Sequence, residues 1–138
     1  MTAAAKAKRH YIILVEDNEQ VCRTATAFLK KYVPEEKIIC VHNLKRALEL
    51  FRAHGPEIDT ILVDGELGEG STCDTLPLAK EIDQHRKHGL FSGLAIAMSS
   101  RQEVNDQLVQ AGCDYAAASK LEAIKAVCAM LAHPHPTH

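Results

Sequence analysis

The chain has 138 residues, of which 46% are hydrophobic and 25% charged, with 16 basic against 18 acidic groups. This length fits one domain, and the apolar content excludes an intrinsically disordered chain. The net charge of −2 argues against nucleic acid or an anionic membrane as the main partner. No apolar run approaches the roughly 18 residues that a membrane-spanning helix needs.

Short apolar runs alternate with helical patterns along the chain. The runs are continuous and rich in β-branched residues, which is typical of strands covered on both faces. They predict strands at 11–15, 37–41, 60–63, 94–98 and 115–118. Apolar residues at helical spacing predict a helix after each strand, over 19–32, 44–54, 74–88, 101–111 and 121–131. Five such β-α units predict an open parallel sheet with helices on both faces.

Several polar residues stand where helices are expected to begin. Asn43 and Asp74 are candidate N-caps, and Ser100 with Glu103 has the spacing of a capping box. Pro77 falls in the first turn of its predicted helix, where proline is tolerated.

The ends of the chain and its cysteines carry little functional signal. We expect residues 1–9 to form a disordered tail, 10–132 the domain, and 133–138 a solvated tail of alternating His and Pro. No C-x-x-C pair occurs and the cysteine count is odd, which favours reduced core thiols in a cytoplasmic protein. These cysteines are Cys22, Cys40, Cys73, Cys113 and Cys128.

Polar side chains follow four of the five predicted strands at their carboxyl ends, where parallel sheets bind ligands. They are Glu16 and Asp17 after the first strand, Asp64 after the third, Ser99 and Ser100 after the fourth, and Lys120 after the fifth. Converging carboxylates repel one another, and Mg²⁺ is the natural counter-ion because it prefers oxygen ligands and bridges to phosphate. A hydroxyl and an ammonium facing them suit a phosphoryl group, and an Asp can be the nucleophile that accepts it. Each residue taken alone could instead be a helix cap, a turn residue or a solvated charge.

These motifs together resemble the receiver domain of two-component response regulators. The likeness rests on Val15-Glu16-Asp17-Asn18, Asp64 after TILV, Ser99-Ser100 after LAIAM, and Lys120, and it covers about residues 10 to 132. It implies a doubly wound, flavodoxin-like α/β fold with five helices and five parallel strands in the order 2-1-3-4-5.

The resemblance assigns a role to each matched residue. Asp64 would be the phosphoacceptor, Ser99 the switch hydroxyl and Lys120 the charge partner of the phosphoryl group. Mg²⁺ would be held by Asp17 and Asp64, with Glu16 as second member of the acidic pair and the Glu66 backbone carbonyl as a further ligand. The implied activity is phosphorelay signalling rather than enzymatic turnover.

The resemblance also implies partners. The phosphoryl group would come from a phosphohistidine on a histidine kinase or a histidine phosphotransfer protein, and an unknown downstream protein would read the altered surface. A homodimer is left open, and neither nucleic acid nor a membrane is expected. The chain ends after the fifth predicted helix, as expected of a stand-alone receiver or of a domain excised from a longer protein.

The sequence departs from the family's pattern near its end. Leu121 replaces the usual proline after Lys120, so the expected cis peptide is lost. The spacing before Lys120 also leaves Tyr115 an uncertain switch aromatic. An alternative is therefore a pseudo-receiver adaptor that does not depend on phosphorylation. A haloacid-dehalogenase-like phosphatase is a weaker alternative, because Asp64-Gly65-Glu66 lies mid-chain and departs from that family's D-x-D motif.

One pair outside the motifs carries a prediction of its own. Glu66 lies two residues beyond Asp64 and Arg101 two beyond Ser99. We expect the two side chains to pair across the mouth of the pocket and to hinder the water that would hydrolyse an aspartyl phosphate.

Overall fold

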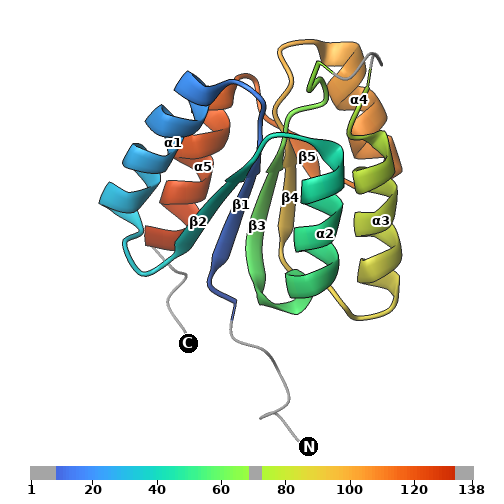
Figure 1. Ribbon diagram of the computed structural model, residues 1–138, viewed down its shortest axis with the longest axis horizontal. Helices are drawn as coiled ribbons and strands as arrows, with labels where there is room; N and C mark the ends of the chain where they lie inside the picture. The colour runs from blue at the N-terminus through green and yellow to red at the C-terminus, as the bar shows by residue number, and fades with distance from the viewer. Residues whose placement is uncertain (1–8, 69–72, 133–138) are drawn as a thin grey trace, which may run out of the picture.

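The computed structural model describes residues 9–68 and 73–132. Its five parallel strands form one sheet in the order β2-β1-β3-β4-β5, which confirms the predicted fold class (Figure 1). The strands are β1 (Tyr11–Val15), β2 (Lys37–Val41), β3 (Ile58–Val63), β4 (Leu94–Ala97) and β5 (Tyr115–Ala116). The helices are α1 (Glu19–Tyr32), α2 (Leu44–His54), α3 (Leu76–Lys87), α4 (Gln102–Ala111) and α5 (Lys120–Ala132), with a 3₁₀ turn η2 (Gly55–Glu57) after α2.

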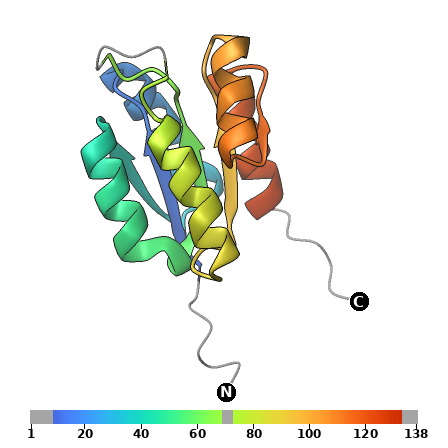
Figure 2. The same ribbon diagram turned by 90° about the vertical axis from the view of Figure 1, so that its right-hand side faces the viewer.

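The sheet is covered on both faces, as its continuous apolar strands predict. Helices α1 and α5 lie on one face, and α2, α3 and α4 lie beside one another on the other (Figures 1 and 2). Successive strand residues point to opposite faces. In β1, Ile12 and Leu14 pack in the core under α1 and α5, whereas Ile13 and Val15 pack in the core under α2, α3 and α4.

Of the three predicted helix caps, the structure confirms one and contradicts two. The Asn43 side chain accepts from the Arg46 N–H at 2.8 Å, as predicted for the cap of α2. Asp74 does not cap α3: the N-cap position falls on Thr75, and Asp74 Oδ2 accepts the Leu67 N–H at 2.7 Å instead. The predicted Ser100–Glu103 capping box is also wrong, because the N-cap of α4 is Arg101 and no side chain caps it. The Asp74 side chain thus stabilises the loop after β3 instead of capping a helix, and the Glu103 side chain pairs with Arg101.

The bounds of the last strand and the last helix differ from the prediction. Strand β5 contains only Tyr115 and Ala116, and Lys120 is the first residue of α5 rather than a strand-end residue. The Ser119 hydroxyl accepts the Glu122 N–H at 3.1 Å and so satisfies a donor of the first turn. Among the described residues no peptide bond is cis, as Leu121 after Lys120 predicts.

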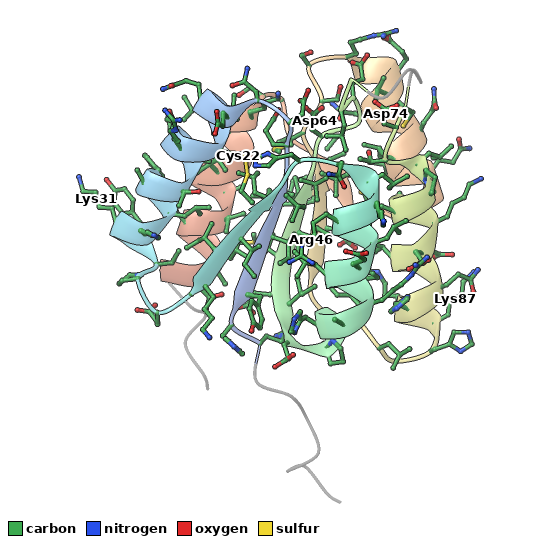
Figure 3. All side chains as sticks on the ribbon, in the orientation of Figure 1. Cys22, Lys31, Arg46, Asp64, Asp74 and Lys87 are labelled. Atoms are coloured by element: carbon green, nitrogen blue, oxygen red, sulfur yellow. A yellow bond between two sulfur atoms is a disulfide. The ribbon has the colours of Figure 1, made fainter. Side chains whose placement is uncertain are left out.

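The cysteine prediction is wrong for two residues. A disulfide joins Cys22 on α1 to Cys40 on β2, with the two Cα atoms 6.3 Å apart (Figure 3). Cys73, Cys113 and Cys128 are buried thiols, as predicted. Spacing along the chain cannot reveal the pair, because it forms only when α1 packs over the edge strand β2.

The predicted tails lie almost wholly outside the described residues. The exception is Arg9, whose guanidinium donates to the Ser92 carbonyl at 2.8 Å and lies 3.7 Å from an Asp59 carboxylate oxygen. Among residues 9–68 and 73–132, no helix has the length and apolarity needed to cross a membrane.

Candidate functional site

Glu16 and Asp64 stand side by side at the carboxyl edge of the sheet because β1 and β3 pair in register. Val15 lies opposite Val63, and the Asp64 N–H continues the ladder by donating to the Val15 carbonyl at 3.0 Å. Glu16 directly follows β1 and Asp64 directly follows β3, so both side chains lie at the same edge of the sheet. Glu16 is fully buried and Asp64 is 5% exposed, and Figure 3 shows Asp64 at this end of the molecule.

Lys120 bridges the two carboxylates. From the first turn of α5 its Nζ lies 2.7 Å from Glu16 Oε1 and 3.2 Å from Asp64 Oδ2. The Lys120 side chain is half-buried, and its ammonium lies against these two buried acids. One ammonium facing two carboxylates leaves the cluster with excess negative charge.

The surroundings of Glu16 and Lys120 shift the pKa values of both groups. Burial raises the pKa of Glu16, although the contact with Lys120 opposes the shift. Burial alone would lower the pKa of Lys120, but Glu16 and Asp64 outweigh it and the net shift is upward. A protonated Lys120 is therefore an integral part of the site.

The carboxylate cluster has the donor set of a hard divalent cation. Oxygen atoms of Glu16, Asp17 and Asp64 lie within 4.8 Å of one another. Asp17 is exposed, so the cluster has access to water, which Mg²⁺ retains when it binds. Gly68, at φ +72°, brings the backbone close to Asp17: a Cβ there would lie 3.5 Å from Asp17 Oδ2. The residues present fit Mg²⁺, which Asp17 and Asp64 would hold with Glu16 alongside.

Glu66 extends the site along the loop that follows β3. Its backbone N–H donates to Asp64 Oδ1 at 3.2 Å, so the two oxygens of Asp64 have different partners. Its side chain pairs with Arg101, with 3.0 Å between Glu66 Oε2 and Arg101 Nη1. The predicted pairing of these two residues is confirmed.

Comparisons with known proteins bear on the fold of the chain. No protein-family model and no curated protein matches the chain. Solved structures do match, and they are mostly response regulator receiver domains. A two-component response regulator from Clostridium difficile is 16% identical with a TM-score of 0.68, over 94% of this chain and 100% of that one. The signal receiver domain of a DNA-binding response regulator from Colwellia psychrerythraea is 16% identical with a TM-score of 0.66, over 88% and 94%.

A third match is a chain in the co-crystal structure of a Saccharomyces cerevisiae histidine phosphotransfer protein and the receiver domain of its downstream response regulator. It is 18% identical with a TM-score of 0.65, over 88% of this chain and 85% of that one. This chain has the receiver-domain fold. The family resemblance in the sequence motifs is thereby confirmed at the level of fold.

Within the receiver-domain fold, Ser99 follows β4 at the same edge as Asp64. The Met98 N–H donates to the Val63 carbonyl at 2.9 Å, which brings the residue after it alongside the end of β3. Ser99 is buried, and its hydroxyl accepts the Arg101 N–H at 3.2 Å. The six predicted site residues Glu16, Asp17, Asp64, Glu66, Ser99 and Lys120 thus lie at one edge of the sheet.

Asn105 is a site residue that sequence reasoning missed. It is buried on α4, its Oδ1 accepts the Ser99 N–H at 2.8 Å, and its Nδ2 donates to the Ser99 carbonyl at 2.9 Å. The side chain therefore holds the Ser99 backbone from both sides. The signal available in the sequence was a polar residue between the apolar Val104 and Leu108 on the buried stripe of the predicted helix.

The loop after Asp64 is anchored by Asp74, which was predicted to be a helix cap, and by its neighbour Thr75. Thr75 Oγ1 donates to the Asp64 carbonyl at 2.9 Å, and the Asp74 N–H donates to the Gly65 carbonyl at 2.7 Å. Gly65 itself packs against α4, and a Cβ on it would lie only 2.1 Å from Val104 Cγ1. A side chain at position 65 would displace the Val104 side chain or the helix that carries it.

His42 is a second missed residue. The sequence shows it after β2 without an evident partner, but its Nδ1 lies 2.9 Å from the Glu16 backbone carbonyl oxygen, within hydrogen-bond distance. Nδ1 also lies 3.9 Å from Cys22 Sγ. His42 thus stands between the carboxylate cluster and the Cys22–Cys40 disulfide.

Proposed function

We propose that this chain is a phosphoacceptor receiver in a phosphorelay, with Asp64 as the acceptor. The observation that carries the proposal is the placement of Asp64, buried at the carboxyl edge of the sheet and bridged to Glu16 by Lys120. The receiver-domain fold of the solved structures that match the chain supports it.

In the proposed reaction an Asp64 carboxylate oxygen attacks the phosphorus of a phosphohistidine. The P–N bond breaks, the imidazole leaves with a proton, and an acyl phosphate forms on Asp64. Mg²⁺ held by Asp17, Asp64 and Glu16 would supply positive charge opposite the phosphoryl oxygens. The backbone N–H of Glu66 orients Asp64 by holding Oδ1.

Two other residues respond to the new phosphoryl group. Lys120 is released from its contact with Asp64 Oδ2 and can pair with a phosphoryl oxygen. The Ser99 hydroxyl, which now accepts from Arg101, can donate to another phosphoryl oxygen. Both changes pull on α4 or α5, so the signal would pass to a downstream protein at that surface.

The phosphoryl donor is a partner with an exposed phosphohistidine, namely a histidine kinase or a histidine phosphotransfer protein. The latter class occurs in one of the matching structures. An apolar hollow of about 220 Å³ between α1 and α5 lies next to Lys120, and we propose that such a partner docks there. Leu121 on its rim is 54% exposed. We place the exchange in the cytoplasm.

The test is an intact-mass measurement after incubation with acetyl phosphate and Mg²⁺. One phosphate adduct is expected, and Asp64→Asn or omission of Mg²⁺ should abolish it. Asp106→Asn, an exposed acid on α4, is the matched control and should keep the adduct. No adduct, also with a phosphohistidine donor, would favour the adaptor. Release of phosphate in large excess over protein would favour a phosphatase.

A further inference from the structure

The Cys22–Cys40 disulfide lies at an opening of the surface. A hollow of about 470 Å³ is lined by both cysteines and by His42, Arg23 and Lys30, with Glu19 as the one acid among the charged residues on its wall. Cys22 is buried, but Cys40 is partly exposed. A small anionic molecule can therefore approach the disulfide from the Cys40 side with favourable charge.

The other thiols have different surroundings. Burial raises the pKa of Cys73 and Cys128, and it raises the pKa of Cys113 to about 12. Their thiolate forms are disfavoured, and the thiolate is the reactive species. Of the cysteines in the described part of the chain, the Cys22–Cys40 pair is the one suited to exchange.

The disulfide is connected to the carboxylate site through the start of α1. Glu16 Oε2 accepts the Asn18 N–H at 3.1 Å, and the Asn18 carbonyl accepts the Cys22 N–H at 3.0 Å. Cys22 Sγ lies 3.5 Å from the Glu16 backbone carbonyl oxygen, beside His42. The bond to Cys40 thus fastens to β2 the helical turn that orients Glu16.

We propose that Cys22–Cys40 is a reversible redox site, exchanged by a small anionic thiol such as glutathione, whose oxidised state preorganises the carboxylate site for Mg²⁺. The Mg²⁺ half rests on the function proposed above. A structural disulfide that stays closed is rare in the cytoplasm, whereas exchangeable ones occur there.

The exchange runs in two steps. A glutathione thiolate attacks Cys40 Sγ, the S–S bond breaks, and Cys22 leaves as a thiolate that takes up a proton. A second glutathione thiolate then attacks the glutathione sulfur of this mixed disulfide and releases Cys40. Two glutathione thiols lose two electrons to become glutathione disulfide, and the protein disulfide gains them.

The first test follows the exchange alone. The full chain, freed of metal with EDTA, is equilibrated at graded ratios of reduced to oxidised glutathione, quenched with acid, and alkylated with N-ethylmaleimide in denaturant. We expect a reversible change from three to five labels, located by peptide mapping at Cys22 and Cys40. Cys128→Ser should keep the two-label change and Cys22→Ser should abolish it. A label count that does not follow the ratio, or that changes at other cysteines, would overturn the proposal.

The second test measures Mg²⁺ binding by calorimetry on the oxidised and reduced full chain. The oxidised form should bind Mg²⁺ several-fold more tightly, because the start of α1 is already ordered. Cys22→Ser/Cys40→Ser should resemble the reduced form in both conditions, and Cys128→Ser should behave as wild type. Equal affinities would overturn the link to the carboxylate site. Absence of Mg²⁺ binding in both forms would contradict the proposed function, while the label count would still decide the redox site.

Discussion

Arg101 and Glu66 join the loops that follow β4 and β3, with 3.0 Å between Arg101 Nη1 and Glu66 Oε2. Arg101 also holds Glu103, with its Nε 2.7 Å from Glu103 Oε1. These contacts, first with Glu103 and then with Glu66, raise the pKa of Arg101, so the guanidinium is charged. Glu66 lies two residues after Asp64, and Arg101 lies two residues after Ser99. Asp64 and Ser99 both belong to the proposed phosphorylation site.

We predict that this ion pair shields an aspartyl phosphate from water. Arg101→Ala should shorten the lifetime of the phosphorylated chain by a few-fold, because the guanidinium no longer closes over Glu66. The rate of phosphate loss, followed by intact mass after removal of acetyl phosphate, measures the effect. Arg46→Ala, which removes an exposed ion pair on α2, is the control. An unchanged lifetime in Arg101→Ala would show that the pair has no shielding role.

A second prediction concerns Lys120 as counter-ion. In Lys120→Met, Glu16 stays fully buried without its cation, so the free energy of unfolding in EDTA should fall by up to about 3 kcal/mol. Mg²⁺ should restore part of this loss by replacing the ammonium. Urea unfolding followed by circular dichroism, with and without Mg²⁺, measures both effects. Lys125→Met, exposed on the same helix, should change little. A Lys120→Met chain as stable as wild type would refute the role as counter-ion.

Asn105 provides a third prediction. Asn105→Ala should lower the free energy of unfolding by about 2 kcal/mol, because the Ser99 N–H and carbonyl lose their partners. Gln107→Ala, on the exposed side of α4, should be nearly neutral. Chemical denaturation of both variants measures the difference, and equal losses would mean that the two hydrogen bonds of Asn105 add no net stability.

A fourth prediction follows from the bidentate ion pair between α2 and α3, in which Arg52 Nε donates to Glu81 Oε2 at 2.7 Å. This hydrogen bond lowers the pKa of Glu81. A lowered carboxyl pKa stabilises the fold above the ordinary value for Glu, 4.5, and this stability is lost as the pH falls through the lowered pKa. Glu81→Gln should therefore be less stable than wild type at pH 7, and the difference should shrink as the pH falls through the lowered pKa of Glu81.

The control for this comparison is Glu49→Gln, which breaks an exposed pair with Arg46 within α2. Thermal unfolding of the three chains at pH 7 and at pH 3 measures the pH dependence. A Glu81→Gln difference of the same size at both pH values would contradict the electrostatic origin.

The strands and the carboxylate cluster could be predicted because they depend on residue patterns that are local in the sequence. The apolar runs of β1 and β3 required burial on both faces, and the acids directly after them had to meet once those strands paired. The carboxylate cluster of Glu16, Asp17 and Asp64 is thus a consequence of strand adjacency. The sequence does not define the place of Tyr115 in the same way. Strand β5 has only two residues, too few for a periodic pattern, and the Tyr115 side chain is 38% exposed.

The remaining features depend on contacts between distant segments. Asp74 has the local signature of a helix cap. In the folded loop, however, its side chain accepts the Leu67 N–H instead of an N–H of the helix. The disulfide needs α1 to lie over β2, and no spacing between Cys22 and Cys40 encodes that packing. His42 and Asn105 likewise acquire partners only when the edge of the sheet has assembled.

The close approach of Gly65 to Val104 has a mechanical consequence. No methyl group fits between Gly65 and Val104, so the loop beside Asp64 is in direct contact with helix α4. We expect a ligand that moves the loop toward α4 to shift the helix as well, which would couple the two surfaces by a free energy. A protein that binds α4 would then change the affinity of the carboxylate site for its ligand by a certain factor. That ligand would change the affinity of α4 for the protein by the same factor.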